Sequence, residues 1–330
     1  MRRREFIAGL GSAAAWPMAA RAQQTERVRR VGVLMGADET DPQRRAWLSA
    51  FTQGLAELGW TNGRNLRMDV RWAGDNIDRI RTFAKELADQ QPDVIFSHTT
   101  PVTAALQRQT RTIPIVFVFV GDPVGEGFVV GLPRPGGNIT GFIPQEAAMA
   151  GKWLELLTEI APGVKRAAAM FNPDTEPFVR RYFLPSFEAA AHSLKVAPIT
   201  ASVRNDAEIE QVMTSLGREP RGGIVLMPDA FVQVHRATII SLAARYNVPA
   251  VYQLSLFVRE GGLVSYGTDG ADLFRRAASY VDRILRGTKA ADLPVQLPVK
   301  FEMAVNAKTA KTLGLIVPQS ILLRADEVIE

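Results

Sequence analysis

From residue 29 onward, short apolar runs alternate along the chain with longer segments whose hydrophobic positions repeat at helical spacing. Residues 31–35 predict a strand, and residues 44–58 predict a helix that ends at Gly59, a typical C′ glycine. Residues 113–120 form an unbroken apolar run, typical of a strand covered on both faces of a parallel sheet. This alternation predicts a doubly wound α/β layer. Further strands are expected at residues 65–72 and 93–97, and further helices at 77–90 and 101–109.

The densest proline and glycine segment, residues 131–138, predicts an exposed connection between two domains. The same alternation then restarts, without a repeat that can be aligned. In this half, helices are expected at residues 147–160, 176–193, 207–216 and 233–246, and strands at 166–171, 196–202, 223–227 and 250–253. A strongly amphipathic helix over 271–286 and a short helix near 308–313 follow. The pattern therefore predicts two α/β halves of similar plan.

The first 22 residues have the three parts of a secretory signal peptide. Residues 2–4 are all arginine, an Ala/Gly-rich apolar stretch follows, and residues 20–22 read Ala-Arg-Ala, an A-x-A cleavage site. Residues 3–7, Arg-Arg-Glu-Phe-Ile, match the core of a twin-arginine export signal. The alternative is an amphipathic start to a cytoplasmic domain. We expect export, with cleavage after about Ala22.

The composition narrows the class of protein. A length of 330 residues is typical of two domains. The net charge of +5 falls to +2 once residues 1–22 are removed, so the charge no longer indicates a nucleic-acid-binding protein. The absence of cysteine excludes disulfides, Cys-ligated metal centres, a catalytic thiol and a lipid-modified cysteine. With only three histidines, neither a metal nor a cofactor is expected. We therefore expect a free, soluble protein of the periplasm that is not a lipoprotein.

Motifs for covalent or phosphoryl chemistry are missing from the sequence. It has no G-x-S-x-G elbow, no Walker loop and no H-E-x-x-H pair. The first predicted strand ends at residues 36–38, Gly-Ala-Asp, without the spaced glycines of a dinucleotide fingerprint. These absences argue weakly against an enzyme, because scattered catalytic carboxylates leave no such motif.

Polar residues gather where predicted strands end, which is the edge at which doubly wound sheets bind ligands. The strongest cluster contains His98, Thr99 and Thr100. Thr100 is expected as N-cap and Pro101 as first residue of the next helix, so that backbone N–H groups and two hydroxyls can bind a carboxylate or phosphate. The alternative is a plain capped helix, with His98 a satisfied structural residue rather than a donor to an anion.

The remaining candidate ligand-binding residues follow other predicted strands. For each, the alternative is a purely structural role in a turn or in the core. The carboxylate of Asp122 is a candidate partner for an ammonium or hydroxyl group of a ligand. The others share only their place at a strand end, and they are Gly36, Asn172, Asp229, Tyr252 and Gln253.

Several segments occur in the same order in a known family. They are residues 113–117 (IPIVF), 121–124 (GDPV), 133–141 (PRPGGNITG), 261–267 (GGLVSYG), 280–287 (YVDRILRG) and 324–330 (RADEVIE). Through them the chain resembles the ABC transporter substrate-binding protein family, which has a type I periplasmic-binding fold. Some members of that family bind tryptophan or other aromatic amino acids. The resemblance covers essentially all of the chain after the signal segment.

The resemblance implies an α/β fold of two doubly wound parallel-sheet lobes, joined by a hinge that the chain crosses near residues 140–142, 264–267 and 294–299. The N-terminal lobe would comprise residues 28–141 plus about 266–293, and the C-terminal lobe residues 142–265 plus about 294–330. By the same resemblance, residues 99–102 and Asp122 would hold the carboxylate and ammonium of an amino acid. Asn172, Asp229 and Tyr252 would close over it. The chain departs from such relatives at residues 228–231, Pro-Asp-Ala-Phe, which leaves the identity of the ligand open.

The function expected from this resemblance is that of a periplasmic receptor of an ABC importer. It would capture a small organic solute, either an amino acid or an aromatic or short carboxylate, and deliver it to a permease in the inner membrane. We expect a monomer, no enzymatic activity and no nucleic-acid partner. A receptor that serves a sensor kinase or chemoreceptor is the alternative, and an exported α/β enzyme acting on small acids is a third reading.

Overall fold

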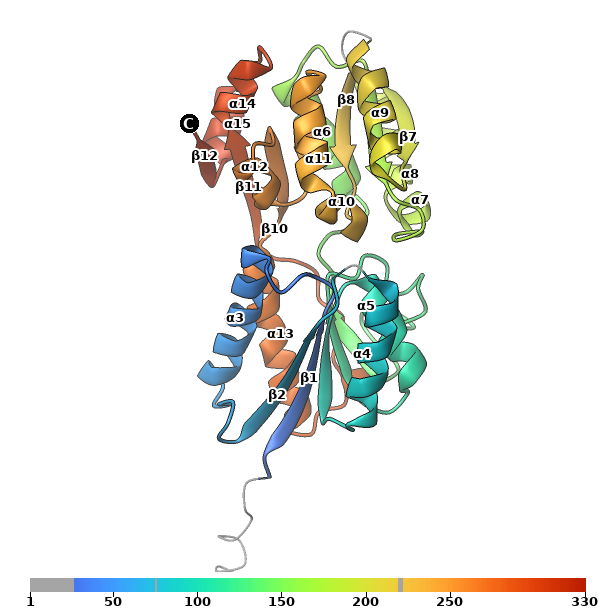
Figure 1. Cartoon of the computed structure of the whole chain (residues 1–330), viewed down its shortest axis with the longest axis vertical. Helices are drawn as coiled ribbons and strands as arrows, with labels where there is room; N and C mark the ends of the chain where they lie inside the picture. Colours follow the sequence, from blue (N-terminus) through green and yellow to red (C-terminus); the bar gives the residue numbers. More distant parts are fainter. Residues whose placement is uncertain (1–26, 75, 219–221) are drawn as a thin grey trace, which may run out of the picture.

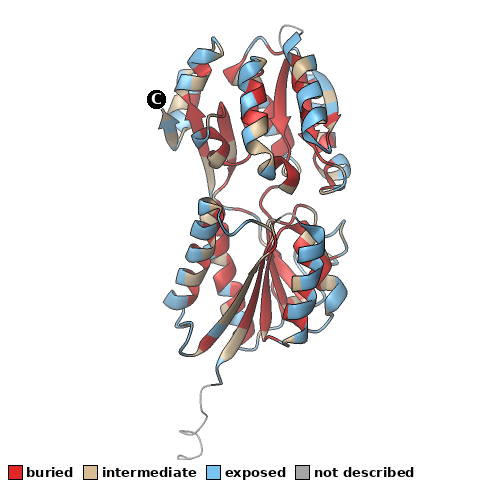
Figure 2. Ribbon diagram, in the orientation of Figure 1, coloured by how far each residue is buried: buried red, intermediate tan, exposed pale blue. Residues whose placement is uncertain are grey.

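The computed structural model describes residues 27–74, 76–218 and 222–330. The expected signal segment, residues 1–22, lies outside the described residues. Two parallel-dominated sheets, each with helices on both faces, form two lobes stacked end to end (Figure 1). The central strands of each sheet are buried and most edge strands are partly exposed, whereas the helices turn their outer faces to solvent (Figure 2). The α/β class and the two-lobed architecture expected from the sequence are confirmed.

The first sheet is entirely parallel. Its order is β2 (Leu66–Trp72), β1 (Arg29–Met35), β3 (Val94–His98), β4 (Ile115–Val118) and β5 (Ile139–Phe142). Successive residues of β1 point to opposite faces, so Val33 and Leu34 enter different cores. The Val33 face is covered by α3 (Pro42–Glu57) and α13 (Gly270–Leu285). The Leu34 face is covered by α4 (Ile77–Asp89) and α5 (Thr100–Gln109).

The second sheet has seven strands, and only the pairing of β10 with β11 is antiparallel. Its order is β12 (Glu327–Ile329), β11 (Phe301–Asn306), β10 (Val264–Thr268), β9 (Ala250–Tyr252), β8 (Gly222–Leu226), β6 (Arg166–Phe171) and β7 (Ala197–Ser202). One face packs on α6 (Met149–Ile160) and α8 (Leu184–Leu194), and the other on α9 (Asp206–Arg218) and α11 (Arg236–Arg245). The shorter helices are α7 (Val179–Tyr182), α10 (Ala230–Val234), α12 (Ser255–Arg259), η1 (Ala290–Asp292), α14 (Ala307–Thr312) and α15 (Gln319–Arg324).

The chain passes between the two sheets three times, and the three crossings lie side by side. It leaves the first sheet after β5, returns to it between β10 and α13, and leaves it again before β11. The first and third crossings are joined by hydrogen bonds from the Ile143 amide to the Gln296 carbonyl (3.1 Å) and from the Gln296 amide to the Gly141 carbonyl (2.9 Å). At the second crossing, the Thr268 hydroxyl donates to the Pro144 carbonyl. Helix α13 therefore packs on the first sheet although its flanking strands belong to the second.

Residues 301–330, where only one short helix was expected, contain β11, α14, α15 and β12. Three predicted elements also differ in length or continuity. The helix expected at residues 176–193 is two helices, because Pro185 lies in the first turn of α8 and cannot continue a preceding helix. The helix expected at 233–246 is also divided, into α10 and α11, at His235, whose ψ is 14°. The strand expected at 113–120 is shorter, because Pro114 precedes it and Phe119 has a left-handed φ of 58°.

Within residues 27–74, 76–218 and 222–330, none of the helices combines the length and the apolar character needed to cross a membrane.

Candidate functional site

A small cavity of about 30 Å³ lies between the two lobes. The first lobe contributes His98, Thr99 and Phe119 to its wall, and the second contributes Glu176, Asp229 and Gln253. Gln145, from the first crossing, closes the side between them. A space of this size holds one or two water molecules. The cavity therefore fits one functional group of a ligand rather than a whole solute.

A larger pocket of about 340 Å³ adjoins this cavity and opens toward solvent. The two share Thr99 from the first lobe and Ala230 and Gln233 from the second. Gly36 and Arg44 line the larger pocket on the first-lobe side. The interlobe site thus has an inner cavity and an outer pocket, and residues of both lobes line each of them.

Unpaired polar atoms concentrate on the inner cavity. Gln145 Oε1, Glu176 Oε2, His98 Nδ1 and both amide atoms of Gln253 are buried and have no hydrogen-bond partner among the described residues. These four side chains are 1 to 5% exposed. A buried polar atom left unpaired costs about 1–3 kcal/mol. Five such atoms around one cavity are typical of a site whose partner is a bound molecule.

The backbone is strained at two residues of the same wall. Thr99 has a φ of 83° and Phe119 a φ of 58°, both in the region that favours glycine. Both residues line the inner cavity, and strain of this kind concentrates at ligand sites. Thr99 occupies the N-cap position of α5, without a side-chain capping bond in the described structure. The prediction that Thr100 caps this helix is wrong, because α5 begins at Thr100 itself.

The cavity is acidic on its second-lobe side. Burial raises the pKa of Glu176 well above its ordinary value, and the carboxylates of Asp229 and Glu126 raise it further. Burial also raises the pKa of Asp229 to about 6, although three hydrogen bonds oppose the shift. These bonds come from the Thr175 hydroxyl (2.7 Å), the Phe231 amide (2.8 Å) and the Asn172 amide. Three hydrogen bonds thus favour the charged form of Asp229, whereas only the Thr100 side chain does so for Glu176, whose Oε2 is unpaired among the described residues.

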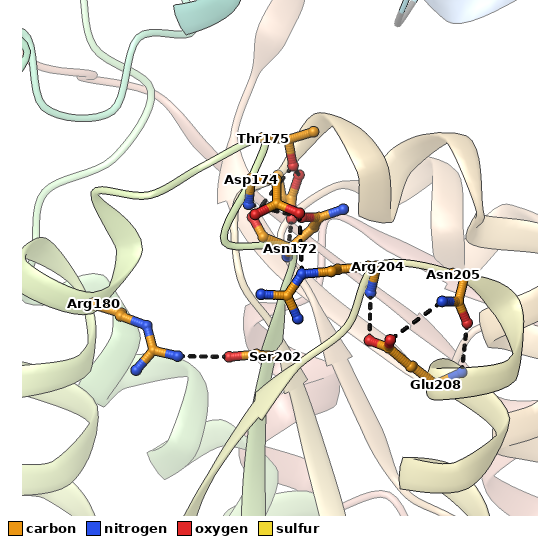
Figure 3. A network of polar contacts seen from close by, with 9 residues as sticks. Asn172, Asp174, Thr175, Arg180, Ser202, Arg204, Asn205 and Glu208 are labelled. Atoms are coloured by element: carbon orange, nitrogen blue, oxygen red, sulfur yellow. Dashed lines mark hydrogen bonds and ion pairs between the residues drawn. The ribbon is translucent and has the colours of Figure 1, made fainter.

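A polar network holds the loop that carries Glu176 (Figure 3). Asn172 Oδ1 accepts a hydrogen bond from the Asp174 amide (2.8 Å), and the Arg204 guanidinium contacts the Asp174 carboxylate at 3.0 Å. The Arg204 amide donates to Glu208 (2.9 Å), which ties this arginine to the start of α9. The Glu176 amide bonds the Asn172 carbonyl at 3.0 Å. The position of Glu176 is thus fixed from both sides of β6.

The first lobe supplies a buried cation, Arg44. Its guanidinium lies 4.0 Å from the centroid of the Trp47 ring, and its Nη2 donates to Gln233 Oε1 of the second lobe. Burial lowers the pKa of Arg44 to about 10, so it remains charged at neutral pH. Its Nη1 has no partner among the residues described. Burial, and then the charge of Arg44, lowers the pKa of His98 well below 6.5, so that imidazole is neutral.

The structure brings five of the residues predicted from the sequence to the interlobe site. His98, Thr99, Asp229 and Gln253 line the inner cavity, and Gly36 lines the outer pocket.

The other four predicted residues have different surroundings. Asp122 accepts a hydrogen bond from Arg181 across the lobes (3.2 Å) and one from the Gly125 amide (2.8 Å). Tyr252 is buried in the core, where its ring stacks on Phe257 at 4.8 Å. Asn172 belongs to the loop network, and the buried hydroxyl of Thr100 has no partner among the described residues, yet neither lines the cavity or the pocket.

Among the site residues that were not predicted are Arg44, Phe119, Gln145 and Glu176. Arg44 and Glu176 stand at the start of predicted helices, where charged residues are ordinary. Gln145 lies in a segment that crosses between the lobes, and the sequence analysis selected only residues at the ends of predicted strands. The positive φ of Phe119 has no signal in the sequence. As for metals, no cluster of three or more His, Asp or Glu side chains suited to an ion occurs in the described parts of the chain.

Comparison with known proteins gives consistent matches. A family model described as ABC transporter substrate binding protein matches residues 39–329. A tyrosine-binding protein of Clostridioides difficile (strain R20291) is 25% identical over 266 residues, which cover 80% of this chain and 75% of that protein.

Two solved structures share the whole architecture. A conserved domain protein of Vibrio cholerae is 27% identical, with a TM-score of 0.84, and the match covers 92% of this chain and all of that one. The ABC domain of Streptococcus pneumoniae in complex with L-Trp is 25% identical, with a TM-score of 0.83, and covers 91% of this chain and 99% of that one.

Proposed function

The chain belongs to the ABC transporter substrate-binding protein family, and on that premise we propose that it captures an amino acid between its two lobes for an ABC importer. The observation that carries this proposal is the interlobe cavity with its five unpaired buried polar atoms. The relatives support the ligand class, since one is a tyrosine-binding protein and another was solved with L-Trp.

The charges around the site fit a zwitterion. A free Nη1 on Arg44 and the backbone at the start of α5 offer partners for a carboxylate in the outer pocket, where Arg44 and Thr99 both lie. The opposite, second-lobe wall carries Glu176 and Asp229. In this proposal Asp122 is not a ligand residue, because Arg181 already pairs with it.

We further propose that the three adjacent crossings form the hinge of a clamshell. The N-terminal lobe is then residues 28–141 with about 266–293, and the C-terminal lobe is residues 142–265 with about 294–330. Ligand contacts from both lobes exist only when the lobes are closed, so a bound ligand shifts the population toward closure. A permease in the inner membrane then recognises the closed form, and no covalent step is needed. Export through residues 1–22 would place the protein, as a monomer, on the outer side of that membrane.

A thermal-shift screen tests this function. Purified protein is heated with single amino acids, aromatic acids, dicarboxylates and sugars. A ligand present at 100 times its dissociation constant adds about 2.7 kcal/mol of stability, which raises the melting temperature by several degrees. We expect hits among the amino acids, and aromatic ones first. Hits confined to sugars, or to acids that lack an amine, would contradict the proposal.

A glycine in the lobe interface provides a test of closure. A Cβ atom added at Gly121 would lie 2.1 Å from Cζ of Phe178, whose ring belongs to the other lobe. Overpacking of this kind costs about 1–3 kcal/mol, and here the cost falls on the closed form. Gly121→Ala is therefore expected to weaken ligand binding about tenfold or more, measured by calorimetry.

The matched control is Gly131→Ala, because no described heavy atom lies within 4 Å of a Cβ added there. This variant should bind like the wild type. Equal affinities of Gly121→Ala and the wild type would show that this lobe contact does not form in the bound state.

A further inference from the structure

We propose that the inner cavity is a subsite for a protonated amine of the ligand, held by Glu176 together with Gln145 and Gln253. The inference rests on the proposed function, and it deepens it by assigning one end of the ligand to named side chains. It also sets a chemical requirement that the solute must meet: a primary amine.

The first argument is the match between donors and acceptors. An ammonium group has three hydrogens to donate and accepts none. Three residues that line the cavity, from three separate segments of the chain, each have an unpaired buried oxygen: Gln145 Oε1, Glu176 Oε2 and Gln253 Oε1. These side chains are 1%, 5% and 2% exposed, so solvent satisfies none of them in the closed form. The number of unpaired oxygens therefore equals the number of hydrogens that an ammonium group donates.

The second argument is size. The cavity of about 30 Å³ accepts a group as large as one or two water molecules, which excludes an aromatic ring. The rest of the ligand then lies in the outer pocket of about 340 Å³, which shares Thr99, Ala230 and Gln233 with the cavity. The amine then occupies the inner cavity, and the rest of the solute occupies the outer pocket.

The third argument is charge. Asp229 and Glu126 both oppose ionisation of Glu176, and no ion pair within the described residues engages Glu176. Of the two nearby arginines, Arg181 already pairs with Asp122 and Glu126, and Arg44 lines the outer pocket, not the inner cavity. A buried carboxyl among carboxylates attracts a cation more strongly than any neutral or anionic group. The missing positive charge is the one that a ligand amine supplies.

The fourth argument is rigidity. The loop that carries Glu176 is held by the Arg204–Asp174 contact at 3.0 Å and by Asp229, which bonds Thr175 and Asn172 (Figure 3). A carboxyl held in place before binding loses little freedom when a ligand arrives. Glu176 is therefore built to receive a ligand rather than to move aside.

The test compares ligands with and without the amine on two proteins. Calorimetry measures the affinity of full-length wild type and Glu176→Gln for L-tryptophan, L-tyrosine and their amine-free analogues indolepropionate and hydroxyphenylpropionate. For the wild type we expect the better amino acid to bind at least about 30-fold more tightly than its analogue. Glu176→Gln should remove at least about 30-fold from the amino-acid affinity and change the affinity for the analogue less than threefold.

Two controls separate the possible outcomes. Glu302→Gln changes another partly buried glutamate, which bonds Ser255 away from the cavity, and it should leave both affinities unchanged. Urea denaturation verifies that Glu176→Gln is folded, as expected for an isosteric change. An equal loss for the amino acid and its analogue, or no loss for either, would overturn the amine subsite while leaving the receptor function intact. If wild type binds neither class, the proposed function fails and the subsite with it.

Discussion

Replacing Phe274 with alanine is expected to lower the free energy of unfolding by about 3–5 kcal/mol, the usual cost of emptying a fully buried aromatic position. Phe274 is 0% exposed on α13, where its ring lies at 5.1 Å from Phe96, 5.7 Å from Trp47 and 5.7 Å from His98. The residue comes late in the chain but packs on the first sheet. Its loss therefore leaves a void directly behind the wall of the ligand cavity.

Urea denaturation followed by circular dichroism measures this effect. Phe274→Leu is the control, since it keeps most of the volume and should lose clearly less stability than the alanine variant. The alanine variant should also bind ligand more weakly, because Trp47 and His98 lose a packing partner. A loss of under 1 kcal/mol would mean that α13 does not pack on the first lobe in solution.

The second large effect is a dependence of stability on pH that originates at Asp229. Burial raises the pKa of Asp229 from 3.8 to about 6, so the folded state binds a proton that the unfolded state has already released. The stabilisation of the folded state by this proton is fully present below pH 3.8 and is lost as pH rises through about 6. The displacement of the pKa corresponds to about 3 kcal/mol. Between pH 4 and 6.5, wild type should thus lose about 2 kcal/mol of this stability relative to Asp229→Asn.

Asn serves as the replacement because it can still accept the capping bond from the Phe231 amide. Asp269→Asn is the matched control, since Asp269 also caps a helix but its pKa is lowered by Lys300 and by backbone bonds that outweigh burial. For Asp269 the sign is reversed, and wild type should lose stability relative to the variant on acidification. Urea midpoints across this pH range measure both differences. Parallel pH profiles for wild type and Asp229→Asn would show that Asp229 is charged when folded.

The fold was predictable because strand and helix periods are local properties of the sequence. The apolar run around β4 and the amphipathic pattern of α13 both identified their elements. Local patterns did not predict where elements are interrupted. Pro185 divides one predicted helix, and the left-handed φ of Phe119 shortens one predicted strand. The lobe on which α13 packs is set by long-range contacts, and it came from the family resemblance rather than from periodicity.

The site was predictable only in part. The strand-end rule selected His98, Asp229 and Gln253, which do line the cavity. It could not resolve which side of a strand end faces the ligand, so it also selected Tyr252, the neighbour of Gln253, which points into the core. Glu176 was not predicted, because what singles it out is a buried Oε2 atom without a hydrogen-bond partner among the described residues. That is a property of the folded surroundings, not of the sequence.

The measurement that tests the account most directly is a crystal structure of the protein with the amino acid that gives the largest thermal shift. The account predicts closed lobes, with the amine nitrogen within hydrogen-bond distance of Glu176, Gln145 and Gln253 in the inner cavity. It predicts the ligand carboxylate on the first-lobe side, near Arg44. A ligand bound outside the interlobe site, or one that turns its carboxylate toward Glu176, would contradict it.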